Sequence, residues 1–249
     1  MRRWARRPAR RGARAPRLLA LVALGVGIVS ALAADLARAG AGETVLTEPD
    51  DARFLEVRTG SATVVEYGGR RAVELVPSPE SAGRDADMLA ILDRAPFGDG
   101  VIELDVAGAP RPDAPPDSRG FVGLAFRTGE HGEWSEVFYL RPTNARCDDQ
   151  LRRNHSVQYV SEPDFPWDRL RREHPGRYES YADLEPGAWT PLRIEVAGTS
   201  ARLFVNGAAQ PCLIVHDLKH GDAPGRIALW AHVETDAHFG SLRTTASSR

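Results

Sequence analysis

Short runs of alternating apolar and polar residues dominate the chain after Gly40, and no segment there keeps a helical apolar period over three turns. Alternation places successive side chains on opposite sides of an extended backbone, so each run predicts a strand with one buried face. Asn206-Gly207 lies between two such runs and predicts a tight hairpin, because both residues tolerate positive φ. The expected strands are 53–57, 62–67, 72–76, 88–93, 100–107, 120–127, 135–141, 157–161, 190–197, 201–205, 213–217, 226–232 and 238–243. The sequence therefore predicts an all-β protein.

So many strands, without internal repeats or a second compositional regime, fit one two-sheet sandwich better than two domains. We expect a single domain over residues 43–249. Residues 109–117 include four prolines and are predicted to form a surface loop. The longest irregular stretch, residues 143–188, is rich in Arg, Asp, Pro and aromatic residues. A loop of that length inside a compact domain is usually functional.

The N-terminus has the layout of an export signal. Eight arginines and no acidic residue occupy the first seventeen positions, and an uncharged run over residues 18–34 follows directly. Small residues allow cleavage before Ala34 or before Gly40, and the second site makes residues 1–39 a signal peptide. The run is slightly short for a spanning helix, which needs about 20 residues, but an uncleaved anchor stays open. We expect an exported protein, periplasmic or extracellular, that is attached to a membrane only if the leader is retained.

Removal of this leader changes the charge of the remaining chain. Residues 1–39 hold nine of the 32 basic residues and one of the 34 acidic residues. The rest carries 23 basic and 33 acidic side chains, a net charge of −10. Such an acidic domain is a poor partner for a phosphate backbone, so we exclude nucleic acid as a ligand. The charge balance directs attention to neutral glycans rather than anionic partners.

Cys147 and Cys212 are the only cysteines in the sequence, and both follow the leader. An oxidising compartment would allow a disulfide between them that closes a loop of 65 residues. Such a bond could stabilise the fold by roughly 4 kcal/mol. Two unpaired thiols fit the spacing equally well, so the sequence leaves the pairing open.

Three expected strands place useful side chains on the face opposite the core. In 120–127, 135–141 and 226–232, alternation turns large apolar residues to one side, which we assign to the core. If these strands are neighbours, the other side forms a patch of rings and guanidinium groups with room for a ligand. Sugars suit such a patch because their C–H faces stack on aromatic rings and their hydroxyls accept from arginine. The outward set is Arg127, Tyr139, Arg141, Trp230 and His232.

The long irregular stretch adds side chains that could form a wall or lid over this face. Asn144, Gln158 and Trp167 join Arg127, Tyr139, Trp230 and His232 as candidate substrate-binding residues. His155 directly precedes an expected strand, at a sheet rim where a general base is often found. A lone histidine is more often structural, so both interpretations of His155 stay open.

Glu103-Leu104-Asp105 is similar to the carboxylate strand of retaining glucanases, Glu-x-Asp-x(-x)-Glu. The closing glutamate is missing, since Ala107 and Gly108 stand in its place, and the two-carboxylate retaining mechanism needs that acid. We therefore interpret Glu103 and Asp105 as the polar face of a sandwich strand.

Other motif-based chemistries find no support in the sequence. It has no zinc-type Cys/His spacing, no Gly-rich phosphate loop and no Gly-x-Ser-x-Gly elbow. Acidic loops such as Asp148-Asp149 could hold a structural Ca²⁺ ion, but no regular ligand spacing supports one. No cofactor is evident, and the metal state stays open.

The order of several short motifs points to a known fold. These are Phe97-Gly98-Asp99-Gly100 before 101–106, Tyr139-Leu140-Arg141-Pro142, Trp189 before 192–196, and 225–230 before His238-Phe239-Gly240-Ser241-Leu242. Over about residues 90 to 245 this order resembles the concanavalin A-like lectin/glucanase fold. More narrowly, it resembles the 3-keto-disaccharide hydrolase-type domain, a relative of family 16 glycoside hydrolases.

The resemblance implies a two-sheet jelly-roll sandwich with carbohydrate on its concave face, lined by Arg127, Tyr139 and Arg141. Cleavage of a keto sugar in such a domain needs a base for an acidified C–H and donors for the enolate. By this resemblance, His155 and Arg141 are the candidate catalytic residues. Many sandwiches of this fold bind glycans without cleaving them, so fold alone does not decide between the two functions.

Three functions therefore stay open: a glycoside hydrolase or lyase of the keto-glycoside type, a non-catalytic lectin-like module, and a structural or interaction domain of the cell envelope. The expected partner of the first two is a small glycoside or a polysaccharide. An enzyme predicts that turnover is lost when Arg141 or His155 is replaced. A lectin predicts binding without product, which weakens when Trp230 is replaced.

Overall fold

The computed structural model describes residues 52–81 and 83–247, and the backbone alone of residues 42–47. The predicted leader and both of its cleavage sites lie outside these ranges, so export stays a prediction. In the described part of the chain, no helix combines the length and the apolar character needed to cross a bilayer.

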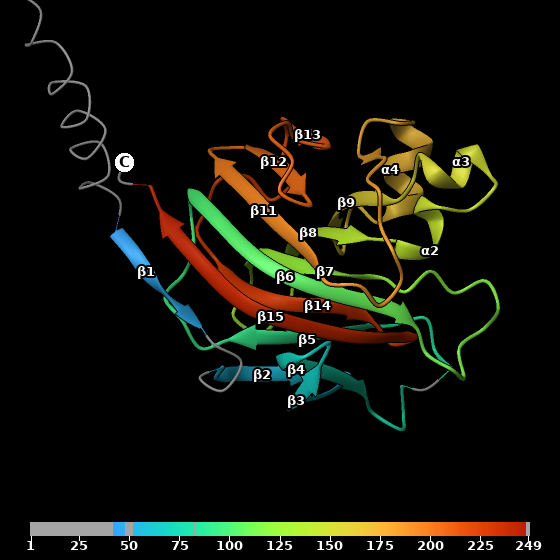
Figure 1. Cartoon of the computed structure of the whole chain (residues 1–249). Coiled ribbons are helices and arrows are strands. Elements are labelled where there is room, and N and C mark those ends of the chain that lie inside the picture. Colours follow the sequence, from blue (N-terminus) through green and yellow to red (C-terminus); the bar gives the residue numbers. More distant parts are fainter. Residues whose placement is uncertain (1–41, 48–51, 82, 248–249) are drawn as a thin grey trace, which may run out of the picture. The chain divides into compact units, whose positions relative to one another are not determined.

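Two antiparallel sheets lie face to face, with β6 and β15 in front and β7 and β14 behind in Figure 1. Sheet A contains β1 (Gly42–Thr47), β3 (Gly60–Tyr67), β4 (Arg70–Pro77), β6 (Gly100–Pro110), β11 (Thr190–Ala197), β12 (Ser200–Val205), β13 (Leu213–Val215) and β15 (Thr235–Ala246). Sheet B contains β2 (Phe54–Arg58), β5 (Asp87–Leu92), β7 (Val122–Thr128), β8 (Ser135–Leu140), β9 (Val157–Glu162), β10 (Glu179–Ser180) and β14 (Arg226–His232).

Within sheet A the strand order is β13-β12-β11-β6-β15-β4-β3, and β1 pairs with β15. In sheet B the order is β10-β9-β8-β7-β14-β5-β2. Every strand expected from the alternation overlaps an observed strand, and the predicted all-β jelly-roll sandwich is confirmed. The predictions missed β1 and β10. The second has two residues, which is too short for alternation to be recognised.

Large apolar side chains from the inner faces of both sheets form the core. Phe126 and Phe138 are fully buried and lie stacked on neighbouring strands, with ring centroids 6.0 Å apart. Leu104 and Phe239 supply buried side chains from the facing sheet. Each such side chain contributes roughly 1.5–3 kcal/mol by leaving water. The alternation thus assigned the inner face of these strands correctly.

Arg127 does not point outward, and the prediction that placed it on the ligand face is wrong. The pairing of β7 with β14 shifts between Arg226 and Ala228, so β7 has an extra residue at this point, and Arg127 has a φ of 48°. A bulge of this kind breaks the alternation of faces. Arg127 is 2% exposed, and its guanidinium donates to the Gly198 and Gly221 carbonyls and to the Asp99 carboxylate. Arg127 therefore ties loops together inside the sandwich.

The stretch predicted to be irregular contains three short helices, α2 (Pro142–Ala145), α3 (Gln150–Arg153) and α4 (Trp167–Glu173). They gather beside β8 and β9 at one end of the sandwich (Figure 1). Pro142 suits the first turn of α2 because a helix start needs no amide donor there. Asp149 caps α3 by accepting from the amides of Leu151 and Arg152, at 2.9 and 3.2 Å. This loop therefore has a defined shape beside sheet B.

Cys147 and Cys212 are not joined by a disulfide in the described part of the chain. The Cys147 thiol donates to the Asn144 carbonyl at 3.1 Å, and the Cys212 thiol donates to the Leu203 carbonyl at 3.4 Å. The sequence left open whether the two cysteines form a disulfide, and in the structure both are free thiols.

Candidate functional site

The register of sheet B places two aromatic rings side by side on its outer face. Gly123 pairs with Tyr139 on one side and with Trp230 on the other. A Cβ on Gly123 would lie 2.1 Å from the Phe138 carbonyl oxygen and 2.8 Å from the Tyr139 Cβ, so glycine is required. The Tyr139 and Trp230 rings have centroids 4.8 Å apart. They form an apolar floor in the middle of the sheet.

Phe121 and His232 extend this floor toward one end of the strands. The Phe121 ring lies 5.6 Å from that of Tyr139 and 5.7 Å from that of His232. The Glu234 amide donates to Nδ1 of His232 at 3.3 Å, and Nε2 lies 3.1 Å from the Asp85 carboxylate. Since Nδ1 accepts this hydrogen bond, Nε2 carries a hydrogen and donates it to Asp85.

Two cavities of about 330 and about 590 Å³ lie over this floor, and Phe121, Trp167 and His232 line both of them. We call the smaller one the aromatic cavity, since Tyr139 and Trp230 also line it. We call the larger one the arginine cavity. Its arginines are Arg84, Arg119, Arg141, Arg152 and Arg171. The shared walls make the two cavities neighbouring parts of one hollow.

Arg141 links the floor to a buried carboxylate. It donates to the Tyr139 hydroxyl at 2.9 Å and to Glu179 at 3.2 Å, and the Arg141 and Glu179 side chains are 6% and 2% exposed. Arg171 also donates to Glu179, and Nε2 of His155 lies 3.4 Å from it. Burial alone would raise the pKa of Glu179, but the hydrogen bonds and charge of Arg171, together with the charge of Arg141, hold it below its usual range. Glu179 is therefore ionised and fixes the groups around it.

His155 and Tyr139 have protonation states set by this cluster. Burial lowers the pKa of His155, Glu179 opposes the shift, and the charges of Arg171 and Arg141 lower it further. The imidazole is therefore neutral near pH 7 and can accept a proton. Burial raises the pKa of Tyr139 to about 12, so its hydroxyl keeps its proton. That hydroxyl can accept from Arg141 and donate to a ligand.

Two carboxyl groups in the aromatic cavity are poorly solvated. Burial raises the pKa of Asp87 to about 7, and the charge of Glu162 adds to this shift. A hydrogen bond donated by Trp230 opposes it. Burial, and next the charge of Asp168, raises the pKa of Glu162. Near neutral pH, Asp87 is therefore protonated in part of the molecules. Carboxyl groups tuned in this way are common at sites of acid–base chemistry.

Most of the predicted site residues lie around this hollow. Gln158 does not, because its fully buried amide donates to the Tyr159 and Tyr178 carbonyls, so its predicted role at the ligand surface is wrong. Asn144 lines the arginine cavity, but it donates to the His155 carbonyl and accepts from Arg152. The predicted residues that line the two cavities are Tyr139, Arg141, Asn144, His155, Trp167, Trp230 and His232.

Sequence reasoning missed Asp87, Glu162 and Arg119, and it assigned no specific role to Glu179. Asp87 begins β5, one residue before the strand expected from the sequence. Had the expected strand begun at Asp87, alternation would have placed its side chain on the same face as that of His232, its register partner. Glu179 had no strand signal to place it. Arg119 and Glu162 flank the expected strands 120–127 and 157–161, and nothing local in the sequence indicates that these strand ends meet.

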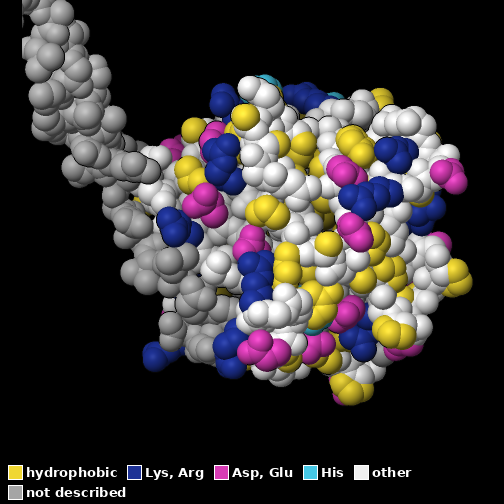
Figure 2. Space-filling view, viewed as in Figure 1, with side chains coloured by type: hydrophobic (Ala, Val, Ile, Leu, Met, Phe, Trp, Pro, Cys, Tyr) yellow, Lys and Arg dark blue, Asp and Glu magenta, His cyan; other side chains and the backbone are white. Residues whose placement is uncertain are grey.

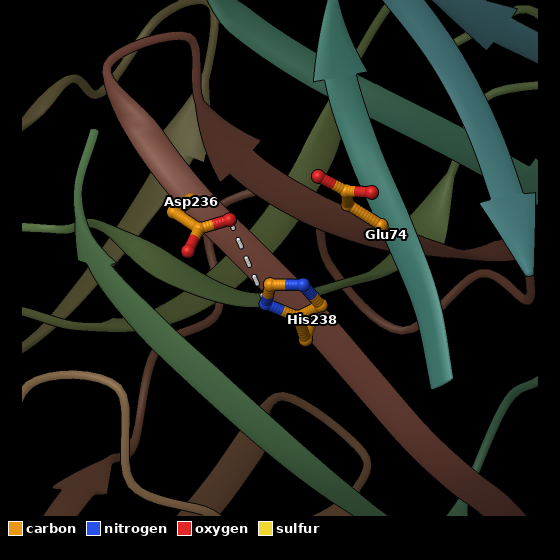
Figure 3. A group of neighbouring side chains, drawn as sticks. All are labelled: Glu74, Asp236 and His238. Atoms are coloured by element: carbon orange, nitrogen blue, oxygen red, sulfur yellow. Dashed lines mark ion pairs between the residues drawn. The ribbon is translucent and has the colours of Figure 1, made fainter. Parts of the chain in front are cut away.

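The outer face of sheet A carries a group that could ligate a metal ion. His238 pairs with Glu74 across β15 and β4, and Asp236 precedes His238 by two residues on the same face (Figure 3). Their ligand atoms lie within 4.8 Å of one another. Burial lowers the pKa of His238, which favours the neutral form that binds metals, and the Tyr67 ring stacks on it at 3.6 Å. An imidazole with two carboxylates suits Zn²⁺ or Mn²⁺ better than Ca²⁺.

The rest of that face alternates in charge, with acidic and basic side chains interspersed in Figure 2. Asp105 pairs with Arg70 at 2.8 Å, and Glu103 lies opposite Arg193 and Arg243 in the register. Glu103 and Asp105 thus lie on the polar face of a sandwich strand, where the sequence had placed them. They line a separate cavity of about 550 Å³.

No protein-family profile matches the sequence, and no curated protein matches it significantly. Among solved structures, the chain is similar to a carbohydrate binding module, CBM66 from Bacillus subtilis, with a TM-score of 0.47 and 13% identity over 83% of this chain and 98% of that one. A protein of unknown function with a galectin-like fold, also from Bacillus subtilis, has a TM-score of 0.48 and 10% identity over 82% of this chain and 100% of that one.

Domain 4 of AbnA, a GH43 extracellular arabinanase from Geobacillus stearothermophilus solved with arabinotriose, has a TM-score of 0.46 and 13% identity, over 84% of this chain and 94% of that domain. At TM-scores below 0.5, these likenesses assign the chain no ligand. The narrower resemblance to a 3-keto-disaccharide hydrolase-type domain stays a hypothesis.

Proposed function

We propose that the outer face of sheet B binds carbohydrate in the hollow formed by the aromatic and arginine cavities. The observation that carries the proposal is the exposure of Trp167 above this hollow. This large ring is 47% exposed and lines both cavities, over a floor that contains Trp230 and Tyr139. An exposed aromatic ring beside fixed polar groups suits the alternating C–H faces and hydroxyls of a sugar.

The polar groups around these rings are held in place before any ligand arrives. Glu179 fixes Arg141 and Arg171, and the Glu234 amide donates a hydrogen bond to the His232 ring. Sugar hydroxyls both donate and accept, and the hollow offers guanidinium donors together with the carboxyl groups of Asp87 and Glu162. Groups that are already ordered bind a ligand with a smaller loss of entropy.

Replacement of Trp167 by alanine is expected to weaken sugar binding about five- to thirtyfold, since stacking on an aromatic ring is worth roughly 1–2 kcal/mol. Trp134 provides a matched control, because it is 46% exposed and lines neither cavity. Calorimetric titration of the full chain, with oligosaccharides chosen from a glycan array, measures both variants. Equal losses in the two variants, or no glycan bound by the unchanged protein, would contradict the proposal.

Cleavage of the bound sugar is the second candidate function, and Asp87 is the observation that favours it. With a pKa of about 7 and Glu162 beside it, Asp87 could protonate a leaving oxygen while a second group acts as base. His155, held neutral by the cluster around Glu179, is the base candidate for a keto-glycoside. A cell-envelope role without a sugar is the alternative if neither binding nor product is found.

Turnover that depends on Asp87 as an acid is expected to fall as the pH rises through about 7, because the acid must be protonated and loses its proton there. The Asp87→Asn variant is expected to lose turnover by 10²-fold or more while it still binds the sugar. Incubation with plain and 3-keto glycosides between pH 5 and 9, with product quantified by mass spectrometry, measures both effects. Binding without product under all these conditions would assign the chain to the lectin-like alternative.

A further inference from the structure

Five arginines line one cavity of a domain whose residues 40–249 carry a net charge of −10. The acidic side chains on the same walls are Asp85, Asp117 and Glu234, and the first two are exposed. Positive charge is thus concentrated at one place in an otherwise acidic domain. Like charges gathered in a partly buried hollow repel one another unless an anion lies between them.

Only part of this charge is neutralised within the described residues. Arg141 and Arg171 share the carboxylate of Glu179. Neither Arg119 nor Arg152 has an acidic oxygen within 4 Å in the described ranges, and both are half-buried. Arg152 donates instead to the neutral Asn144 side-chain oxygen, at 3.3 Å from both Nε and Nη2. Two guanidinium groups therefore face the cavity without an ion partner.

The electrostatic state of Arg119 agrees with this geometry. Burial lowers its pKa, the charges of Arg152 and Arg141 lower it further, and Asp117 opposes the shift. The three arginines are therefore close enough to destabilise one another. A bound anion would remove that repulsion and accept charge-assisted hydrogen bonds.

The adjoining aromatic cavity has the opposite polarity. Asp85, Asp87 and Glu162 line it, and no arginine does. An anionic group there would be repelled, whereas the same group would be attracted at the arginine end. Because Trp167 and His232 line both cavities, a sugar ring held on Trp167 could direct its charged substituent into the arginine cavity.

We propose that the arginine cavity is an anion subsite, in which Arg119 and Arg152 hold the carboxylate or sulfate group of an acidic sugar. This inference rests on the proposed carbohydrate function and names the class of sugar. It replaces the expectation of neutral glycans, which was drawn from the net charge of the chain.

The test uses matched pairs of sugars that differ in the acidic group, such as oligosaccharides of galacturonate and of galactose, titrated into the full chain by calorimetry. The acidic sugar is expected to bind at least about tenfold more tightly than the neutral sugar, and added NaCl is expected to reduce that difference. Sodium sulfate alone is expected to bind much more weakly than the acidic sugar, because it lacks the ring that contacts Trp167.

Arg119→Gln and Arg152→Gln are each expected to remove most of the preference for the acidic sugar, so that the acidic and the neutral sugar bind with nearly equal affinity. Arg172→Gln is the control, since its side chain is 65% exposed and lines neither cavity. Thermal unfolding of each variant tests whether the fold is retained.

The outcomes separate this inference from the function on which it rests. Equal binding of acidic and neutral sugars overturns the anion subsite and leaves carbohydrate binding standing. Binding of sulfate as tightly as the acidic sugar overturns the assignment of an acidic sugar as the ligand, since the sugar ring then contributes nothing. No binding of either sugar overturns the proposed function itself.

Discussion

Replacement of Glu179 by alanine is expected to lower the free energy of unfolding by about 3–5 kcal/mol, because it leaves a buried arginine without its carboxylate. The Arg141 side chain is 6% exposed and has Glu179 as its ion partner, and Arg171 and His155 contact the same carboxylate. Removal of one acid thus leaves two guanidinium groups and an imidazole facing one another. Sugar binding is expected to be lost as well, since Arg141 and His155 would no longer be held in position.

Denaturation in urea, followed by fluorescence, measures this loss of stability. Glu185→Ala is the matched control, because Glu185 is 63% exposed and pairs with the exposed Arg146. Exposed pairs contribute about 1 kcal/mol or less, so the control is expected to unfold near the concentration at which the unchanged protein unfolds. If Glu179→Ala and Glu185→Ala unfold at the same urea concentration, the buried cluster around Glu179 does not stabilise the fold as proposed.

Replacement of Arg127 by methionine is expected to cost about 3–5 kcal/mol of stability and to leave the sugar affinity of the folded protein unchanged. Methionine has nearly the length of the arginine stem but cannot donate to the Gly198 and Gly221 carbonyls or neutralise Asp99. Urea denaturation measures the first effect, and calorimetry on the folded variant measures the second. A variant that is stable but binds no sugar would restore Arg127 to the ligand face where alternation placed it.

Arg127 also shows where sequence reasoning ends. Alternation assigned the faces of Tyr139 and Trp230 correctly, because both lie in regular parts of β8 and β14. The same rule failed at Arg127, because one extra residue in β7 reverses the face and leaves no mark in the pattern of apolar residues. Periodicity therefore predicts the middle of a strand better than its irregular end.

The candidate site was predictable only in part, because much of it is built from loops. The strands supplied the aromatic floor, which the sequence pattern places on one face. Arg119 precedes a strand, Arg152 lies on α3 and Arg171 lies on α4, and their meeting depends on the packing of the long loop against sheet B. The net charge of the chain also did not predict the charge of the site, because an acidic domain can still concentrate arginines in one cavity.

A crystal structure of the protein with an acidic oligosaccharide tests most directly whether the outer face of sheet B binds carbohydrate. We predict a sugar ring against Trp167, over the floor formed by Tyr139 and Trp230, with its acidic group beside Arg119 and Arg152. A sugar bound instead in the cavity on the outer face of sheet A, between Glu103 and Arg193, would contradict the account.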